Sequence, residues 1–409
     1  MLDDVVVMVL AGGVGERLYP LTKERAKPAV YFGGPYRIID FTLSNCINSG
    51  LRRIFIALQY KSLSLTRHLR FGWSVVADEL GEFVEVLHPQ KRVGEHWYQG
   101  TADAVYQNLY SIQREGPRHL IVLSGDHVYK MDYARMLRFH QDRGAGATLA
   151  VIEVGSEEAH RFGIMQVDEQ DRLTGFLEKP RDLPPGGQHL ASMGIYIFDC
   201  QVLQEMLEAY ADDNDFGKAI IPRAIHERKV VSYPFKGYWN DIGTVRSFFD
   251  TNLMLTEPKP AFNLFDAQMP LYTNARLLPP AKITRTRVES SIISEGSVVI
   301  DSDISHAIIG IRSYLGARTR INRVVMMGAD YYRWEDPASR TRVEGPTHPG
   351  VDEDSVVERA IIDKNASIGR DCRITNDAGV QEGEGPGFYI RDGIIVIAKN
   401  AEIADGTVI

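Results

Sequence analysis

Apolar residues in the first 255 positions form short continuous runs that alternate with stretches of helical periodicity. The runs predict strands at these positions: Val5–Leu10, 54–58, 120–123, 147–154, 194–198 and Val230–Pro234. Apolar residues spaced three and four apart predict helices at 102–114, Tyr133–Arg143, 200–210 and 216–228. Strands that are apolar throughout and separated by helices are typical of a mainly parallel sheet covered on both faces. We therefore expect a Rossmann-like α/β domain over residues 1–255.

Beyond residue 280 the apolar pattern changes to one position in every six. The six-residue steps join Ile292, Val298 and Ile304; Ile309, Leu315 and Ile321; Val356, Ile362, Ile368 and Ile374; and Ile397, Ile403 and Ile409. Such hexapeptide repeats are typical of a parallel β-helix, in which each triangular coil stacks its inward side chains on the next. We expect a left-handed β-helix over residues 281–409, after a proline-containing linker at 256–280.

The repeat is interrupted between Gly328 and Gly350 by an irregular, charged segment that contains Tyr331, Tyr332 and Trp334. A long irregular segment in a compact domain is usually functional or part of an interface, and the aromatic residues favour an interface over disorder. The ends of a β-helix are also open edges. Both features predict that the chain forms an oligomer.

Composition narrows the classes of partner and location. The 409 residues carry a formal net charge of −8, which argues against general binding to nucleic acid or to anionic membranes. The three cysteines are far apart in the sequence, show no metal-ligand spacing and indicate a reducing compartment. No apolar run approaches the roughly 18 residues that span a bilayer, and the first strand follows Met1 too closely for a signal peptide. We expect a cytoplasmic protein.

A glycine-rich loop follows the first strand, and four cations follow within the same short segment: Gly12, Gly13 and Gly15, then Arg17, Lys23, Arg25 and Lys27. Glycines let backbone N–H groups approach a ligand closely, and clustered cations suit a polyanion such as a triphosphate. The loop fits neither a P-loop nor a dinucleotide fingerprint. An ordinary turn with surface cations is the alternative.

The segment from Leu10 to Pro28, LAGGVGERLYPLTKERAKP, resembles the signature of the sugar-1-phosphate nucleotidyltransferases. The residues RAKPAV, FGG, RIIDF and LSNC that end or follow it are similar to those of the glucose-1-phosphate adenylyltransferases, and the resemblance covers nearly the whole chain. It implies Mg²⁺-dependent transfer of AMP from ATP to glucose 1-phosphate, which yields ADP-glucose and pyrophosphate. In that family the reaction is the allosterically regulated, committed step of glycogen or starch synthesis.

Two aspartates are candidate metal ligands. Asp126, in the sequence SGDH, follows a predicted strand, and Asp241 lies in the sequence YWNDIGT at the expected start of a helix. Carboxylates suit Mg²⁺, which proteins usually hold with one or two of them plus phosphate oxygens. By resemblance these are the metal-binding aspartates of the family. The alternatives are a turn residue for Asp126 and a helix N-cap for Asp241.

The resemblance also implies the substrate contacts. For ATP these are Leu10, Ala11, Gly12, Gly13, Gly15, Gln59, Gly100 and Thr101. For glucose 1-phosphate they are Tyr98, Gly163, Glu178, Lys179, Ser192 and Asp241. The residues expected to be catalytic are Arg17, Arg25, Lys27 and Asp126. Each assignment has a structural alternative. The cations Arg17, Arg25 and Lys27 could form a solvated basic face, Glu178 and Lys179 could be a charge pair on an edge strand, and Thr101 could be a helix N-cap. The choice of adenine rests on the resemblance alone.

Regulation and assembly are implied in the same way. Lys364 and Lys399 resemble the activator-binding lysines of relatives that respond to 3-phosphoglycerate. The resemblance also implies phosphate or AMP as an inhibitor. It further implies a homotetramer. Pro35 stands after Gly33-Gly34 where enteric relatives carry a lysine, which argues against fructose 1,6-bisphosphate as activator. The alternative for both lysines is a solvent-facing β-helix corner.

Three other functions compete with this interpretation. A uridylyl- or guanylyltransferase would share the same domains. A catalytically silent regulatory subunit would share them too, although the charged residues expected at the site are all present. A hexapeptide acyltransferase would need an active histidine in the β-helix, and only His306 lies within a clear repeat.

Overall fold

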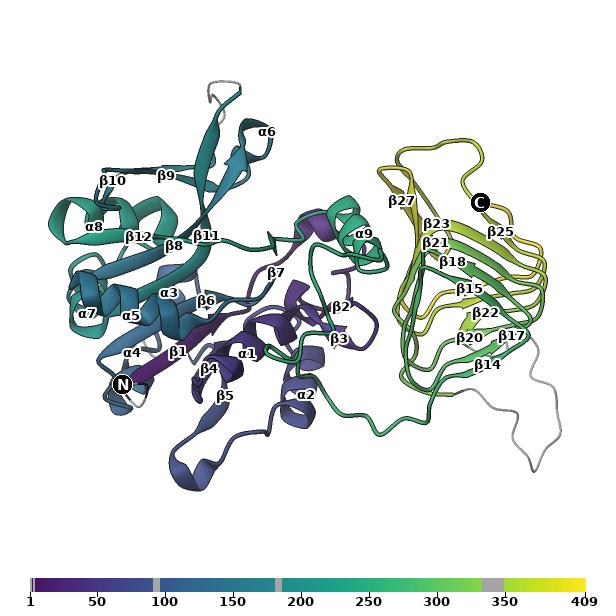
Figure 1. Cartoon of the computed structure of the whole chain (residues 1–409), viewed down its shortest axis with the longest axis horizontal. Coiled ribbons are helices and arrows are strands. Elements are labelled where there is room, and N and C mark those ends of the chain that lie inside the picture. Colours follow the sequence, from purple (N-terminus) through teal and green to yellow (C-terminus); the bar gives the residue numbers. More distant parts are fainter. Residues whose placement is uncertain (1, 3, 91–95, 181–185, 333–348) are drawn as a thin grey trace. The chain divides into compact units, whose positions relative to one another are not determined.

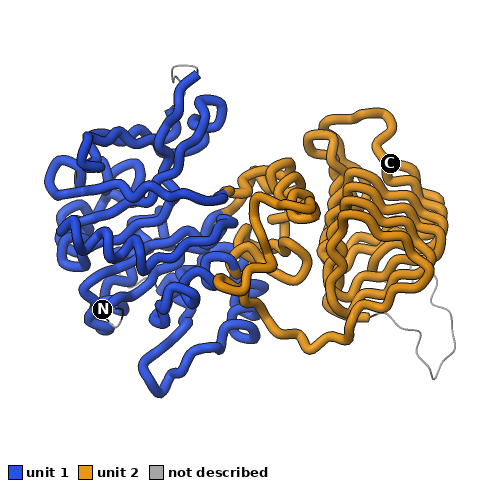
Figure 2. Tube along the Cα trace, viewed as in Figure 1, with its two compact units in different colours: residues 1–13, 41–239 blue, residues 14–40, 240–409 orange. Residues whose placement is uncertain are grey.

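The computed structural model describes residues 2, 4–90, 96–180, 186–332 and 349–409 (Figure 1). Contacts between residues divide the chain into two compact units (Figure 2). Unit 1 comprises residues 1–13 and 41–239, and unit 2 comprises residues 14–40 and 240–409. Trp334 of the predicted interface segment lies outside the described residues.

Unit 1 contains one mixed sheet. Its strands are β1 (Val5–Leu10), β4 (Arg53–Ala57), β5 (Phe83–Leu87), β6 (His119–Ser124), β8 (Ala147–Gly155), β9 (Gly163–Val167), β10 (Leu173–Glu178), β11 (Gln188–Asp199) and β12 (Val230–Pro234). The main order is β10-β9-β11-β6-β1-β4-β5, and β8 pairs with β11 and β12. Pairs among β1, β4, β5 and β6 are parallel, as is β8 with β12, whereas β11 runs antiparallel to its neighbours. The expected mainly parallel α/β sheet is confirmed, with β11 and β10 running antiparallel to the other strands.

Helices cover this sheet. They are α1 (Ile38–Asn48), α2 (Leu63–Gly72), α3 (Thr101–Tyr106), α4 (Leu109–Arg114), α5 (Tyr133–Arg143), α6 (Ser156–Ala159), α7 (Cys200–Ala209), the π-helix η4 (Phe216–Ile220) and α8 (Ile221–Glu227). The unit also contains the short strand β7 (Val128–Tyr129) and the 3₁₀ turn η3 (Asp78–Leu80). Helices α3, α4, α7 and α8 supply apolar residues to the core on one face of the sheet. The predicted helix at 102–114 is two helices, because the chain breaks at Gln107 and Asn108.

Unit 2 is built around a parallel β-helix. Its strands are β14 (Lys282–Thr284), β15 (Arg287–Glu289), β16 (Ile292–Ile293), β17 (Val298–Ile300), β18 (Asp303–Ser305), β19 (Ile308–Ile309), β20 (Tyr314–Leu315), β21 (Arg320–Met326), β22 (Gly350–Val351), β23 (Val356–Ile362), β24 (Ser367–Ile368), β25 (Arg373–Ile374), β28 (Ile394–Ile397) and β29 (Glu402–Ile403). Strands of successive coils pair in parallel, for example β18 with β21 and β21 with β23. The inserted hairpin of β26 (Gly383–Gly385) and β27 (Phe388–Arg391) is antiparallel, and β27 also pairs antiparallel with β28.

The predicted six-residue steps are correct for most of the coils and shifted by one residue at Ile292, Val298 and Val356; Ile293, not Ile292, packs against the core of the β-helix. Val299 and Val357 are fully buried in the core of the β-helix, whereas the predicted Val298 and Val356 are only half-buried. The step from Val299 to Ile304, like that from Val357 to Ile362, has five residues. Where one side of a triangular coil has five residues instead of six, the residue that faces the core shifts by one position. A strict six-residue count does not detect this shift.

Corners of the coils use left-handed backbone. The structure gives positive φ at Asp301, Arg318, Asp354, Asn365 and other corner residues. Asn and Asp adopt this conformation more readily than most residues, because their short side chains bond to the local backbone. His306 is another such corner, exposed and with φ of 49°.

The N-terminal segment of unit 2 packs with its last helix, α9 (Val245–Met254). This segment holds two 3₁₀ turns, η1 (Glu16–Leu18) and η2 (Lys27–Ala29), and the hairpin of β2 (Tyr31–Phe32) and β3 (Tyr36–Arg37). Gly33 N donates to Asn252 Oδ1 of α9 at 2.9 Å, and α9 packs on β21. Residues 255–281, all of them described, form no helix or strand.

We expect Gly328→Ala to destabilise the β-helix more than Gly406→Ala. Both glycines have φ above 70°, where an added Cβ costs about 1–2 kcal/mol. A Cβ at Gly328 would also overlap the carbonyl oxygen of Ile311, whereas nothing lies within 4 Å of one at Gly406. Thermal unfolding should place Gly328→Ala about 2 kcal/mol below the matched control. Equal losses would contradict the steric argument.

Candidate active site

The glycine-rich loop and the Asp126 turn leave the sheet of unit 1 side by side. Leu10 ends β1, Ser124 ends β6, and the two are register partners in a parallel pair. Gly125 N donates to Leu10 O at 3.0 Å, and Ala11 N donates to Ala57 O of β4 at 3.0 Å. Ligands of open α/β sheets bind where parallel strands end, so this edge is the natural place for a site.

Gln59 lies next to the glycine-rich loop. A Cβ added at Gly12 would meet Gln59 Cβ at 3.4 Å, and Gly13 has open space around it. Unit 1 thus brings together a large part of the expected ATP set, namely Leu10, Ala11, Gly12, Gly13 and Gln59.

The Asp126 carboxylate is oriented by its neighbours. Its Oδ1 accepts a hydrogen bond from Ser124 Oγ and lies 3.4 Å from His127 Nε2. The side chain remains 27% exposed, so its oxygens can still reach a ligand. The His127 ring packs edge-on against Trp239, which in turn packs against Phe162, with centroid distances of 5.2 Å in both pairs.

A second group of predicted residues gathers around the end of β10. Glu178 ends this strand opposite Gly163, the first residue of β9. Side chains larger than glycine do not fit at position 163, because a Cβ would overlap the ring of Phe176 and lie 3.1 Å from Glu178 Oε2. Lys179 follows with φ of 45°, and its Nζ lies 3.0 Å from Glu178 Oε1. Positive φ in a non-glycine residue is uncommon and is often found at functional sites.

Two residues that the sequence analysis missed belong to this group. Tyr196 OH lies 3.5 Å from Ser192 Oγ on β11, where the pairing with β8 shifts register. Burial raises the pKa of Tyr196 to about 12, and the negative charges of Asp215 and Glu178 act in the same direction. The phenol therefore stays protonated beside two carboxylates, which gives a cluster of hydrogen-bond donors and acceptors suited to a polyhydroxylated ligand.

Asp215 is placed by an irregular turn. Its Oδ1 accepts from Lys218 N at 3.0 Å and caps the π-helix η4, a form of helix often found at functional sites. A Cβ at Gly217 would lie 3.0 Å from Glu178 Oε2, so the turn lies against the glutamate. A π-helix has no periodic signature in the sequence, and only the short polar run from Asp212 to Asp215 hints at a turn.

The stretch from Tyr98 to Thr101 differs from the expectation in one respect. Gly100 is the N-cap of α3, Thr101 is its first residue, and no side chain caps the helix. The Thr101 hydroxyl instead accepts from Phe216 N at 3.0 Å, which joins α3 to η4. Tyr98 OH accepts from Asn108 Nδ2 at 2.8 Å. The predicted Thr101 cap is wrong because this hydroxyl is used in a contact between distant segments.

Unit 2 holds the cationic half of the loop. Gly15 has φ of 67°, and a Cβ there would lie 3.1 Å from Lys27 Cβ, so the turn folds onto Lys27. Lys27 is buried, and its Nζ donates to Asp241 O at 2.5 Å. Arg17 is exposed.

Asp241 does not open α9. The helix begins at Val245, and its N-cap is Thr244, whose Oγ1 accepts from Ser247 N at 3.1 Å. Ile242 has φ of 42°, a rare conformation for a β-branched residue. Asp241 is therefore held in a strained turn, and the capping alternative for this residue is wrong. Asp241 belongs to unit 2 and Asp126 to unit 1.

Of the two candidate regulatory lysines, Lys364 is not a solvent-facing corner, whereas Lys399 keeps 27% of its side chain exposed. Lys364 is buried, its Nζ lies 4.0 Å from the centroid of the Tyr31 ring, and it donates to Met327 O at 3.3 Å. Burial lowers the pKa of Lys364. Burial would raise the pKa of Tyr31, but Lys364 and Arg37 outweigh this effect and lower it to about 8. Lys399 Nζ pairs with Glu24 Oε2 at 2.9 Å.

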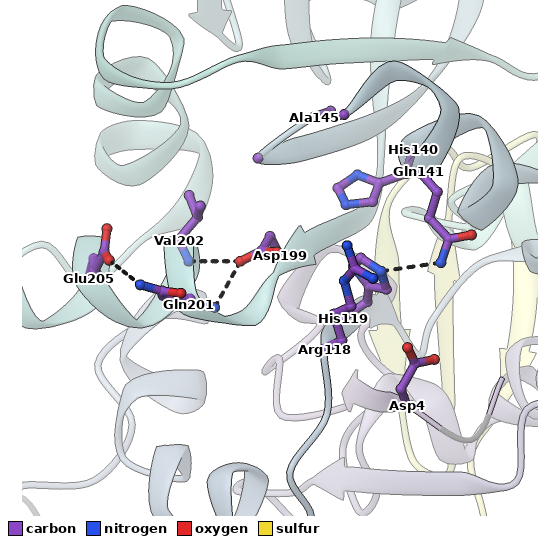
Figure 3. A pocket seen from close by; sticks show the side chains of 12 residues that line it. Asp4, Arg118, His119, His140, Gln141, Ala145, Asp199, Gln201, Val202 and Glu205 are labelled. Carbon is purple, nitrogen blue, oxygen red and sulfur yellow. Dashed lines mark hydrogen bonds between the residues drawn. The ribbon is translucent and has the colours of Figure 1, made fainter. Parts of the chain in front are cut away.

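A separate cavity of about 760 Å³ opens at the amino ends of the strands of unit 1 (Figure 3). It is lined by Asp4, Arg118, His119, His140, Gln141, Gly144, Ala145, Gly146, Asp199, Gln201, Val202 and Glu205. Asp4 precedes β1 and His119 begins β6, so the cavity lies at the opposite edge from Leu10 and Ser124. No predicted site residue lines it.

Comparison with known families gives two matches. Residues 6–258 match the family model described as "Nucleotidyl transferase", and residues 276–408 match the one described as "GLGC left-handed parallel beta-helix domain". The second match confirms the predicted hand of the β-helix. In the part of the chain that the structure describes, no helix is both long and apolar enough to cross a bilayer.

We expect His140 to make unit 1 sensitive to acid. Burial first, then the charges of His119 and Arg118, lower the pKa of His140 to about 4 against the opposing effect of Asp199; the His119 ring lies edge-on at a centroid distance of 5.1 Å. Because this histidine binds a proton more readily in the unfolded chain than in the folded one, the folded protein loses stability as pH falls from about 6.5 towards 4. At pH 5 the loss relative to pH 7.5 should be about 2 kcal/mol.

Urea unfolding of wild type and His140→Gln at both pH values measures this difference. The variant should lose less stability on acidification, while His226→Gln, which replaces an exposed histidine on α8, should behave as wild type. An identical acid response in His140→Gln and wild type would exclude His140 as the cause.

Proposed function

The chain belongs to the nucleotidyl transferase family and has the two-domain architecture of a glucose-1-phosphate adenylyltransferase, and from this premise we propose that it makes ADP-glucose from ATP and glucose 1-phosphate. The observation that carries the proposal is the edge of the unit 1 sheet where β1 and β6 end. There the glycine-rich loop, Gln59 and the Asp126 turn lie together, as binding and activating a nucleoside triphosphate require.

The proposed reaction is a direct displacement. A phosphate oxygen of glucose 1-phosphate attacks the α-phosphorus of ATP, one P–O bond forms, and the bond to the oxygen that bridges to the β-phosphorus breaks. Pyrophosphate leaves. The attacking oxygen is already anionic, so no general base is needed, and catalysis consists of positioning and charge stabilisation. We propose that Arg17 and Lys27 contact the departing phosphates and that amides of the glycine-rich loop contact the others.

Two aspartates would hold the metal. The donor chemistry fits Mg²⁺, because Asp126 offers a partly exposed carboxylate and Asp241 a second one next to a strained turn. When bound, Mg²⁺ supplies charge stabilisation at the phosphate oxygens. Ser124 and His127 hold the Asp126 carboxylate in a fixed orientation.

The cluster at the end of β10 supports a sugar subsite. Glu178, Ser192, Tyr196 and Asp215 offer acceptors and donors for hydroxyl groups, and the exposed ammonium of Lys179 suits the sugar phosphate. We propose Tyr98 and Gly163 as further parts of its wall. Adenine is proposed from the family, since the chemistry of these residues does not select a base.

Regulation by a phosphorylated metabolite is a further part of the proposal. Lys399 already holds the Glu24 carboxylate, which shows that its ammonium can bind an anionic group. We propose Lys399 and Lys364 as regulatory residues, with a 3-phosphoglycerate-like activator and phosphate or AMP as inhibitor.

Self-association is supported by the first coil of the β-helix. Ile283 and Val288 are about half exposed there, and β14 and β15 each pair on one side only. An apolar, half-paired edge favours a partner that covers it. Four copies are proposed from the family. A cytoplasmic location is supported by the free thiols of Cys46, Cys200 and Cys372.

A pyrophosphate-release assay tests the reaction. With glucose 1-phosphate and Mg²⁺, we expect release with ATP to exceed release with UTP or GTP by at least about tenfold, a discrimination that buried polar contacts to a base readily supply. Chelation of Mg²⁺ should abolish it. A preference for UTP or GTP would indicate a uridylyl- or guanylyltransferase, and no release with any triphosphate would indicate a silent subunit.

Asp126→Asn should lower kcat by about 10²-fold or more and change the KM for glucose 1-phosphate little. The carboxylate matters most as charge develops at the phosphates, so its loss affects the transition state more than substrate binding. Steady-state kinetics measure the effect, and Asp250→Asn on the exposed face of α9 is the matched control. Wild-type turnover in Asp126→Asn would remove this residue from the mechanism.

A further inference from the structure

Two consecutive residues of unit 2, Glu24 and Arg25, are held by two stacked coils of the β-helix. Glu24 pairs with Lys399, and the Arg25 guanidinium pairs with Asp363. Ile362 and Ile397, which precede these two partners, are register partners in the parallel pair of β23 and β28. Asp363 N donates to Ile397 O and Asn400 N to Lys364 O, both at 3.0 Å, so the two corners form one rigid surface.

The pair of Arg25 with Asp363 is buried on both sides. Arg25 Nε donates to Leu21 O at 3.1 Å, and its Nη2 contacts both Asp363 and Met327 Sδ. Asp363 Oδ1 also accepts from Lys364 N at 2.5 Å, which fixes the carboxylate. A guanidinium that is 4% exposed and bonded in this way is committed to the interior of unit 2. It is poorly placed to contact a phosphate.

The position of Arg25 is passed on to Lys27 over a short, stiff segment. Ala26 is buried, and Lys27, Pro28 and Ala29 form the 3₁₀ turn η2. Val30 N donates to Lys27 O at 3.0 Å and closes this turn. The Lys27 ammonium then donates to Asp241 O, so the same segment carries a proposed phosphate contact and holds the backbone of a proposed metal ligand.

We propose that Asp363 is a positioning residue for nucleotidyl transfer, which acts by holding Arg25 and thereby fixing Lys27. This inference rests on the proposed role of Lys27 at the phosphates. Small displacements of a catalytic cation are costly, because a shift of about 1 Å can lower a rate 10²-fold. In this view Arg25 contributes through Asp363 and not through contact with the nucleotide.

The test is steady-state kinetics of Asp363→Asn, which keeps the shape and the bond to Lys364 N but removes the charge. We expect kcat to fall at least about tenfold, with the KM for glucose 1-phosphate within about twofold of wild type. Asp363→Glu, which restores the charge, should recover a large part of the loss. Wild-type kcat in Asp363→Asn would overturn the proposal.

A matched control separates positioning from general destabilisation. Asp352 is another buried aspartate of the β-helix, 3.6 Å from Arg370 and bonded to Glu353 N, and neither of these contacts, within the described residues, involves the segment of Lys27. Asp352→Asn should leave kcat unchanged. A similar loss of kcat in both variants would show a structural effect and overturn the proposal.

Two further readouts keep the outcomes distinct. If Asp363→Asn does not fold, Arg25→Lys tests the same link, because one ammonium cannot hold Leu21 O and Asp363 in the geometry of a guanidinium. Wild-type kcat in Arg25→Lys would overturn the proposal. Failure of the proposed function is recognised separately, by the absence of ADP-glucose formation in the wild-type enzyme.

Discussion

The parallel pairing of β1 with β4 on one side and β6 on the other is the constraint on which the candidate site in unit 1 depends. Parallel strands all end at the same edge of the sheet, so the chain must cross back to the opposite edge before the next parallel strand begins. The segments that follow Leu10, Ala57 and Ser124 are therefore neighbours in space, although the sequence separates them widely. The strand pairing alone brings Gly12, Gln59 and Asp126 to this edge, without direct interactions between their side chains.

In unit 2 the stacked coils of the β-helix likewise fix the positions of side chains that are far apart in the sequence. In the inner coils of the β-helix, backbone hydrogen bonds to neighbouring coils fix the corners, so a side chain at such a corner has a defined position. Asp363 and Lys399 use that position to hold Glu24 and Arg25. The segment from Val14 to Asp40 is further fixed by Thr273 and Arg276, which bond to Asp40 Oδ2 at 2.7 Å and to Pro35 O at 3.1 Å. The cations of the loop thus share a unit with the β-helix.

Sequence periodicity predicted the elements whose burial is regular. β1, β12 and α5 have the predicted bounds, because burial along each of them follows a single period. Periodicity failed where a contact between distant segments decides the local structure. Thr101 bonds to Phe216 N instead of capping α3, η4 forms a π-helix, and five-residue sides shift the inward positions at Val299 and Val357. The sugar-site candidates Tyr196 and Asp215 depend on such contacts, so no local pattern identifies them.

The burial of Lys364 changes what a substitution there can reveal. Its ammonium lies over the Tyr31 ring and donates to Met327 O, and a desolvated cation–π contact is worth more than an exposed one. Removing Lys364 would therefore disturb the β2 hairpin whether or not a metabolite binds there. Lys399 is different, because its partner Glu24 is exposed and can exchange that contact for water. A loss of activation on replacing Lys399 is for this reason better evidence of a metabolite contact than the same loss at Lys364.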